Sequence, residues 1–103
     1  MAEAFTYKLT TESELFSFDF SQVLAANETI STATCSVIVM DGTDANASAI
    51  LSGNATISGQ KTNQRVQGGV SEVTYRLVMT ITTSASNTYT AVGDIPVLAP
   101  NLV

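Results

Sequence analysis

The longest regular pattern in the chain is Val73-Thr74-Tyr75-Arg76-Leu77-Val78-Met79-Thr80-Ile81, where apolar and polar side chains alternate. Successive side chains of a β-strand point to opposite faces, so this alternation predicts a strand with one buried face. The residues expected on the buried face are Val73, Tyr75, Leu77, Met79 and Ile81. A helix would give the same residues no continuous apolar stripe, so a helix is not predicted here.

Two more stretches alternate in the same way. Phe16-Ser17-Phe18-Asp19-Phe20 places three rings on one face, and residues 33–39 place Ala33, Cys35, Val37 and Val39 on one face. Weaker strands are predicted at residues 5–9, 50–57, 61–66, 88–92 and 95–97, the third of them as an exposed polar strand. A single helical turn within residues 21–27 is expected to place Leu24 over one end of the core.

Turn-forming residues separate these strands. Asp41-Gly42, Ser58-Gly59 and Gly68-Gly69 supply residues that tolerate the positive backbone φ of tight turns. About seven or eight short strands, with turn signals at roughly every 8–15 residues, are typical of an antiparallel β-sandwich rather than of alternating strands and helices. The predicted fold class is therefore all-β.

The chain has 103 residues, which is enough for one domain with one two-layer core. We expect a single sandwich domain over residues 1–97 and an extended tail over residues 98–103, where Pro96 and Pro100 punctuate the end of the chain. Hydrophobic residues make up 45% and charged residues 13%, a composition too apolar and too weakly charged for disorder. No apolar run approaches the ~20 residues that span a bilayer, so no membrane partner is expected.

The residue types that most catalytic and metal sites need are scarce. The chain has no His, no Trp and one Cys, which excludes a His-based triad, a Cys/His zinc site and a disulfide framework. No carboxylate pair suggests a general acid with its base. We therefore predict that the protein is not an enzyme and has no cofactor and no catalytic or metal-binding residues.

The charge balance argues against nucleic acid as a partner. Four basic residues stand against nine acidic ones, for a net charge of −5, whereas binding to a phosphate backbone takes clustered Lys and Arg. Lys61 and Arg65 fall on one face of the predicted polar strand. Two cations of this kind suit a contact with an acidic neighbour.

Two other residue groups have both a chemical and a structural interpretation. Asp41-Gly42-Thr43-Asp44 could contribute ligands to a calcium loop, but it lacks the further oxygen ligands and the closing Glu of an EF-hand, and a turn is favoured. Cys35 lies on the inward parity of its strand. No His or cluster of cations is available to activate it, so it is predicted to be a small buried hydrophobe.

The order of these features is similar to that of a known group of proteins. The Phe16–Phe20 strand is followed by Asn27-Glu28-Thr29-Ile30, then by Gly68-Gly69, by the strand around Tyr75, by Thr80 to Ser84, and by Ile95-Pro96-Val97. Over roughly residues 14 to 98 the chain resembles small immunoglobulin-like proteins encoded among the structural genes of tailed bacteriophages. The resemblance implies an immunoglobulin-like antiparallel β-sandwich, in which Tyr75 either bonds back to the backbone at a strand corner or simply buries its ring.

The resemblance also implies a function. It implies a non-enzymatic component of the virion, assembled in the host cytoplasm: a head decoration protein, a neck component or the anchor of a fibre. The implied partners are other virion proteins, namely capsid, portal or neck, and tail subunits, together with further copies of the same chain as a homo-oligomer. The sequence does not choose among these positions.

The end of the chain is the candidate interface. Leu98, Pro100, Leu102 and Val103 belong to an apolar, proline-stiffened segment that lies beyond the predicted sandwich. Apolar surface of this kind is costly in water, so we expect the segment to contact a neighbouring subunit or another virion protein. A frayed terminus is the alternative.

A second function class is a carbohydrate-binding or adhesin-like module. Such a module needs exposed rings that stack on sugars. Trp is absent, and only Tyr7 and Tyr89 are plausible exposed rings. A virion structural role is therefore the preferred hypothesis.

Overall fold

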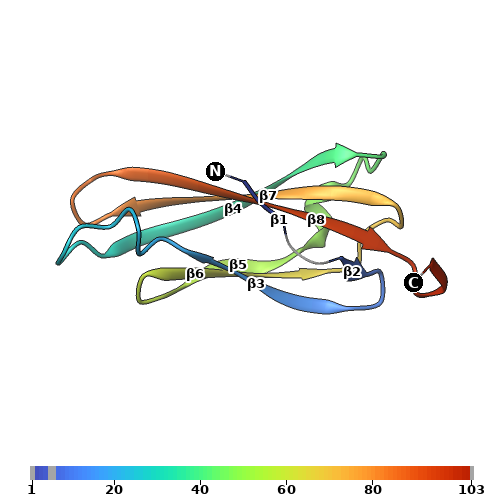
Figure 1. Cartoon of the computed structure of the whole chain (residues 1–103), viewed down its shortest axis with the longest axis horizontal. Helices are drawn as coiled ribbons and strands as arrows, with labels where there is room; N and C mark the ends of the chain where they lie inside the picture. Colours follow the sequence, from blue (N-terminus) through green and yellow to red (C-terminus); the bar gives the residue numbers. More distant parts are fainter. Residues whose placement is uncertain (1, 5–6, 103) are drawn as a thin grey trace.

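Two β-sheets packed face to face make up most of the computed structural model, which describes residues 2–4 and 7–102 (Figure 1). The strands are β1 (Ala2–Ala4), β2 (Lys8–Leu9), β3 (Ser13–Asp19), β4 (Ile30–Asp41), β5 (Leu51–Ser58), β6 (Lys61–Gln67), β7 (Val73–Thr83) and β8 (Thr88–Leu98). Two short 3-10 helices, η1 (Ala47–Ile50) and η2 (Pro100–Leu102), complete the elements. The predicted all-β sandwich is confirmed. Within the part that the structure describes, no helix is long and apolar enough to cross a membrane.

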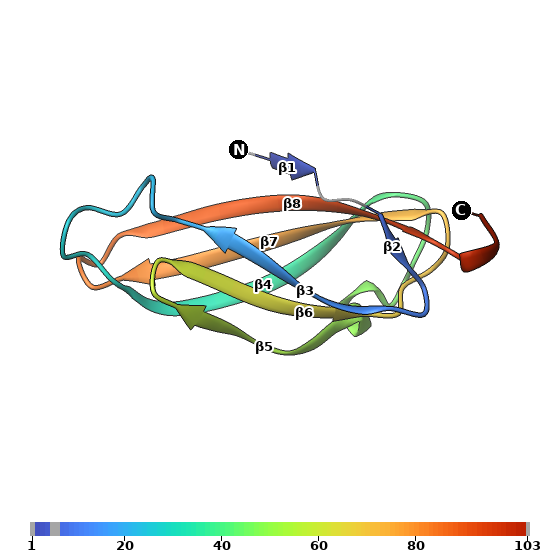
Figure 2. The same ribbon diagram turned by 60° about the horizontal axis from the view of Figure 1, so that its bottom comes forward.

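The larger sheet has the order β1-β8-β7-β4, with β2 also on β8, and the smaller sheet has the order β3-β6-β5 (Figure 2). Strands β3, β6 and β5 make up the smaller sheet, and β8, β7 and β4 make up the main part of the larger sheet. The antiparallel pairing expected throughout holds for all of these strands. It is wrong for β1 and β2, which run parallel to β8 along its outer edge.

The core is built by the two alternating stretches that dominate the sequence. Phe16, Phe18 and Phe20 point inward from the end of β3, and the inward face of β7 packs against them. The buried apolar residues are Phe16, Phe18, Phe20, Leu24, Ile30, Ile50, Val66, Val73, Tyr75, Leu77, Met79, Ile81, Ile95 and Val97. The predicted register of both stretches is confirmed.

β4 follows the same alternation with less burial. Ala33, Cys35, Val37 and Val39 pack against the core but are only partly buried, because β4 lies at the edge of the larger sheet. In the loop before β4, a hydrogen bond from the N–H of Leu24 to the carbonyl of Phe20, at 3.2 Å, closes a turn. Leu24 is buried there, as predicted for a residue that covers one end of the core.

The strand predicted at residues 61–66 is confirmed as β6, but the prediction that it is exposed is wrong. β6 is the central strand of the smaller sheet, and its inward residues Thr62, Gln64 and Val66 are buried. The Gln64 amide nitrogen donates to the carbonyls of Gly53 at 3.2 Å and Arg65 at 2.9 Å, so both of its hydrogens are used. Gln64 can thus take an inward position on this strand because its amide nitrogen is satisfied internally.

The two strands predicted at residues 88–92 and 95–97 are one continuous strand, β8. Pro96 is paired with Thr74 of β7. Hydrogen-bonded and non-hydrogen-bonded pairs alternate in an antiparallel ladder, and the Thr83 N–H to Asn87 carbonyl bond fixes which pairs are bonded. Counted from that bond, the Thr74–Pro96 pair is non-hydrogen-bonded, so the missing N–H of proline removes no ladder bond and the strand continues.

The tail differs from the expected extended segment that begins at residue 98. Leu98 is the last residue of β8, pairs with Leu9, and accepts a hydrogen bond from the Thr10 N–H at 2.9 Å. Pro100–Leu102 forms one 3-10 turn, in which the Leu102 N–H donates to the Ala99 carbonyl at 2.9 Å. Leu98 is thus extended as part of β8, whereas Pro100–Leu102 forms a turn rather than an extended segment. The hydrogen bond between Leu102 and Ala99 satisfies two backbone groups locally and so stabilises this turn.

Candidate interaction site

A buried lysine anchors β2 by hydrogen bonds, at the end of the sandwich where the tail also lies. Lys8 is fully buried, and its Nζ donates to the carbonyls of Leu9 at 2.8 Å and Gly68 at 2.6 Å. Burial lowers the pKa of the Lys8 ammonium, which Glu12 and Glu14 partly offset. The bond to Gly68 links β2 to the β6–β7 loop, and the bond to Leu9 lies within β2. Nothing in the sequence distinguishes this lysine from an exposed one, because Gly68 lies 60 residues away.

Tyr75 ties three segments together at the same end. Its hydroxyl accepts a hydrogen bond from the Val70 N–H at 2.9 Å and donates to Asp44 Oδ2 at 2.6 Å. The other oxygen, Asp44 Oδ1, accepts from the Asn46 N–H at 2.9 Å. Of the two alternatives for Tyr75, the bond back to the backbone is therefore confirmed. Burial, together with the bond to Asp44, raises the pKa of the Tyr75 hydroxyl to about 12.

Gly69 permits this arrangement. Its φ is +101°, and a Cβ there would lie 3.2 Å from the Val97 side chain and 3.4 Å from the Tyr75 ring. A side chain at this position would be strained and would crowd both residues. The prediction that Gly68-Gly69 forms a turn is confirmed. A shallow hollow of about 390 Å³ lies beside it, lined by Asp44, Asn46, Ala49, Ile50, Gln67, Gly68, Gly69 and Val70.

The tail lies at this end, beside the label C in Figure 1. Leu98 is half-buried, Pro100 and Leu102 are exposed, and Val103 lies outside the described residues. The Ala99 N–H donates to Ser71 Oγ at 3.0 Å, which holds the start of the tail on the β6–β7 loop. Pro100 and Leu102 therefore form an uncharged, exposed surface directly after Ala99, whose position is fixed by its hydrogen bond.

The outer face of the larger sheet is flat, with few charges. Three strands bring six threonines into two rows across the sheet: Thr32, Thr82 and Thr88, then Thr34, Thr80 and Thr90. Arg76 and Asp94 form an ion pair with two bonds, at 2.6 Å and 3.0 Å, and the guanidinium lowers the pKa of the Asp94 carboxyl. Ile38 on β4 is exposed and lies beside Arg76 of β7.

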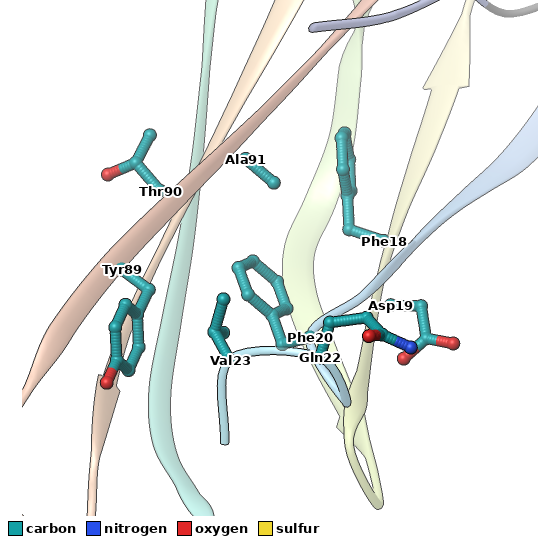
Figure 3. Close-up of a pocket in the computed structure, with 8 residues that line it drawn as sticks. All are labelled: Phe18, Asp19, Phe20, Gln22, Val23, Tyr89, Thr90 and Ala91. Atoms are coloured by element: carbon teal, nitrogen blue, oxygen red, sulfur yellow. The ribbon is translucent and has the colours of Figure 1, made fainter. Parts of the chain in front are cut away.

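An open groove lies between the two sheets, far from the tail (Figure 3). Its volume is about 310 Å³, and it is lined by Phe18, Asp19, Phe20, Gln22, Val23, Tyr89, Thr90 and Ala91. The end of β3, the loop after it and the start of β8 supply these residues. Tyr89 and Leu98 are nine residues apart along β8, or about 30 Å. The groove and the tail therefore occupy opposite ends of the sandwich.

The loop beside the groove is anchored by a buried carboxylate. Glu28 Oε1 accepts a hydrogen bond from the Ala25 N–H at 2.9 Å, and Oε2 accepts from Thr83 Oγ1 at 2.5 Å and from Asn87 Nδ2 at 2.9 Å. These bonds lower the pKa of the Glu28 carboxyl, and the bond from the Ala25 backbone has the largest effect. They join the loop that carries Val23 to the β7–β8 turn.

Glu28 makes the stability of the protein sensitive to acid. Its pKa is lower in the folded chain than the ordinary 4.5, so its contribution is complete above pH 4.5 and is lost as the pH falls through the folded value. Glu28→Gln is therefore expected to lower Tm at pH 7 and to reduce the further loss of Tm between pH 5 and pH 2.5. Thermal unfolding followed by circular dichroism measures both. Glu72→Gln, at an exposed residue, is the control and should keep the wild-type pH profile; an equal acid loss of Tm in Glu28→Gln would contradict the assignment.

The structure also shows the surroundings of the other candidate residues named from the sequence. Burial raises the pKa of the Cys35 thiol to about 11, which does not favour a nucleophile. Asp41 ends β4 and Gly42 follows with φ +88°, as predicted for a turn. Across residues 2–4 and 7–102 no group of three or more His, Cys, Asp or Glu side chains could hold a metal ion. Lys61 and Arg65 lie exposed on the outer face of β6.

Comparison with known families gave one match. Residues 8–95 match the family model described as Gp77, Podophage GP4 fiber-tail adaptor protein gp77. The match covers β2 to most of β8, and so both sheets of the sandwich. No curated protein and no solved structure gave a significant match.

Proposed function

The chain belongs to the podophage GP4 fiber-tail adaptor protein gp77 family, and on that premise we propose that it connects a tail fibre to the tail of the virion. It is a small phage virion structural protein. The single observation that carries the finer proposal is the family match, which spans both sheets of the sandwich. Of the positions that the resemblance left open, head, neck or fibre anchor, the family name supports the last.

The chemistry of the chain suits a mechanical role. It has no His and a single Cys, whose thiol pKa is raised. A connector needs two separate contact surfaces, because it must hold one protein on each side. The tail and the groove lie at opposite ends of the sandwich, which supports such a role. A carbohydrate-binding role has less support, because of its two candidate rings only Tyr7 is exposed, whereas Tyr89 is half-buried in the groove wall.

The tail is the first proposed contact. Leu98, Pro100, Leu102 and Val103 remain the proposed interface residues, with Leu98 also serving β8. The exposed, uncharged Leu102 gains free energy when a neighbour covers it. Further copies of the same chain, as a homo-oligomer, also remain a proposal, which the mass of the purified protein in sedimentation would test.

Leu102→Asp is expected to lower the amount of this protein and of tail fibre in purified virions by about tenfold, because a charge in an apolar contact is poorly tolerated. Quantitative mass spectrometry of purified particles measures both proteins. The matched control is Ile57→Asp on β5, because Ile57 is 42% exposed and Leu102 is 48% exposed. The same loss in both variants, or no loss in Leu102→Asp, would count against the tail as an interface.

A deletion gives the second test of the tail. Removal should begin after Ala99, because Leu98 pairs with Leu9 and its carbonyl accepts from Thr10. A chain that ends at Ala99 is expected to keep its Tm within a few degrees and to lose incorporation as Leu102→Asp does. Wild-type incorporation of the shortened chain would show that the tail is a free terminus.

A further inference from the structure

The outer edge of β8 offers backbone hydrogen bonds beside the groove. β1 pairs with Val92–Asp94 and β2 pairs with Val97–Leu98. Counted from the Thr83 N–H to Asn87 carbonyl bond, the pairs that contain Thr88 and Thr90 are non-hydrogen-bonded toward β7. Thr88 and Thr90 therefore turn their N–H and C=O groups to the outer edge. Among the described residues, no strand pairs with this edge at 88–91.

The groove begins directly under this edge. Tyr89 and Ala91 alternate with Thr88 and Thr90 along β8, so their side chains point to the face opposite to that of the two threonines. Tyr89, Thr90 and Ala91 all line the groove. Phe20 and Val23 form the opposite wall, and Figure 3 shows these side chains around the same opening. An unpaired strand edge next to an apolar hollow is the arrangement that binds an extended peptide, whose backbone joins the sheet and whose alternate side chains enter the hollow.

The charges of the chain indicate which kind of peptide segment would bind at the groove. Asp19 is the one charged residue among those that line the groove. The Ser21 N–H donates to its Oδ1 at 2.8 Å and lowers the pKa of the carboxyl, so Asp19 is ionised at neutral pH. The whole chain has a net charge of −5. Lys8 is buried and Arg76 is paired with Asp94, so much of the positive charge is already engaged.

We propose that an extended segment of another virion protein adds to β8 as a strand beside residues 88–91, placing an apolar side chain in the groove and a Lys or Arg near Asp19. The segment runs parallel to β8 and in line with β1, so it continues a pairing that the fold already uses at Val92–Asp94. Electrostatic complementarity favours a basic segment on a chain of net negative charge. The inference rests on the proposed connector function and assigns its second contact, about 30 Å from the tail.

Photo-crosslinking in assembled virions tests the occupant directly. Virions are produced with p-benzoylphenylalanine in place of Tyr89, irradiated after purification, and the crosslinked peptide is sequenced by mass spectrometry. The expected partner is a segment of a different virion protein, with alternating apolar residues next to Lys or Arg. The control carries the same crosslinker in place of Ile57, which is exposed on β5, outside the groove.

The other outcomes overturn the inference. A crosslink to residues 98–102 of a second copy would show that this uncharged tail occupies the groove. A crosslink to an acidic segment, or a yield no higher than that of the Ile57 control, would also overturn it. If the protein is absent from purified virions, the proposed function fails as well; if it is present without the crosslink, only the second contact fails.

Substitutions test whether the backbone edge of β8 and the groove take part in binding the segment. Thr90→Pro removes an N–H that faces the outer edge, whereas Thr90→Val keeps it, so crosslinking from position 89 should fall about tenfold in the first variant only. Thermal unfolding establishes whether Thr90→Pro is folded. If it is not, Val23→Ser removes apolar surface from the groove wall without adding charge, and a fall in crosslinking is again expected. Unchanged yields in the folded variant tested would overturn the inference.

Discussion

Phe18→Ala is expected to lower the free energy of unfolding by about 3–5 kcal/mol, the largest effect of any substitution considered for this chain. Phe18 is 1% exposed and lies on β3 between two other buried rings, Phe16 on the same strand and Phe20 directly after its end. Removing the ring takes apolar surface out of the core and leaves a cavity that the two sheets fill only in part. A loss of this size is a large share of the ~5–15 kcal/mol that stabilises a typical domain.

Chemical denaturation measures this effect. The midpoint in urea should fall while the slope of the transition stays the same, since the surface exposed on unfolding hardly changes. Leu15→Ala on the same strand is the control, because Leu15 is 48% exposed and a change of about 0.5 kcal/mol or less is expected. A midpoint that barely moves in Phe18→Ala would place the ring outside the core and contradict the register of β3.

Tyr75→Phe is expected to cost about 1–3 kcal/mol although it changes only one oxygen atom. The hydroxyl accepts from the Val70 N–H and donates to Asp44 Oδ2, so its loss leaves one donor and one acceptor without this partner. Leaving a partly buried polar group unpaired costs more than the net value of the bond. Tyr7→Phe is the control, because Tyr7 is half exposed and a change near zero is expected.

A double-mutant cycle separates this network from ring packing. Tyr75→Phe and Asp44→Ala should be less than additive when combined, because each removes the same hydrogen bond. Strict additivity would show that Asp44 and Tyr75 do not interact in solution.

The difference between wild type and Tyr75→Phe should also shrink at high pH. The folded pKa of about 12 lies above the ordinary 10.0, so the contribution of this group is complete below pH 10 and is lost as the pH rises toward 12. Unfolding curves at pH 8 and pH 11 measure this change. A constant difference between the two pH values would contradict a shifted pKa for this hydroxyl.

The alternation of side chains was sufficient to predict the two stretches that build the core. In both, each residue on the inward parity is apolar, and water expels all of them to one face whatever strand lies alongside. The same reasoning failed for β6, where Thr62 and Gln64 have the composition of a surface strand. They are buried because β6 lies between β3 and β5, and the amide of Gln64 finds carbonyls there.

The candidate site was harder to predict because its parts come from distant residues. The tail was proposed as an interface from its apolar, uncharged composition, which did not predict its 3-10 turn. The groove joins the Phe20 region of β3 to Tyr89 of β8 and has no local signal. The partner of Tyr75 is 31 residues away at Asp44, and Glu28 bonds to Thr83 across 55 residues.

A period of two along the chain is a local property, so reading it needs only the neighbouring residues. For this reason the strands, their inward faces and the absence of the usual catalytic residue types follow from the order of amino acids. Which strand pairs with which depends on contacts between residues far apart in the chain. The parallel pairing of β1 and β2 with β8, the burial of Lys8, and the open edge beside the groove therefore emerge only when the two sheets are assembled.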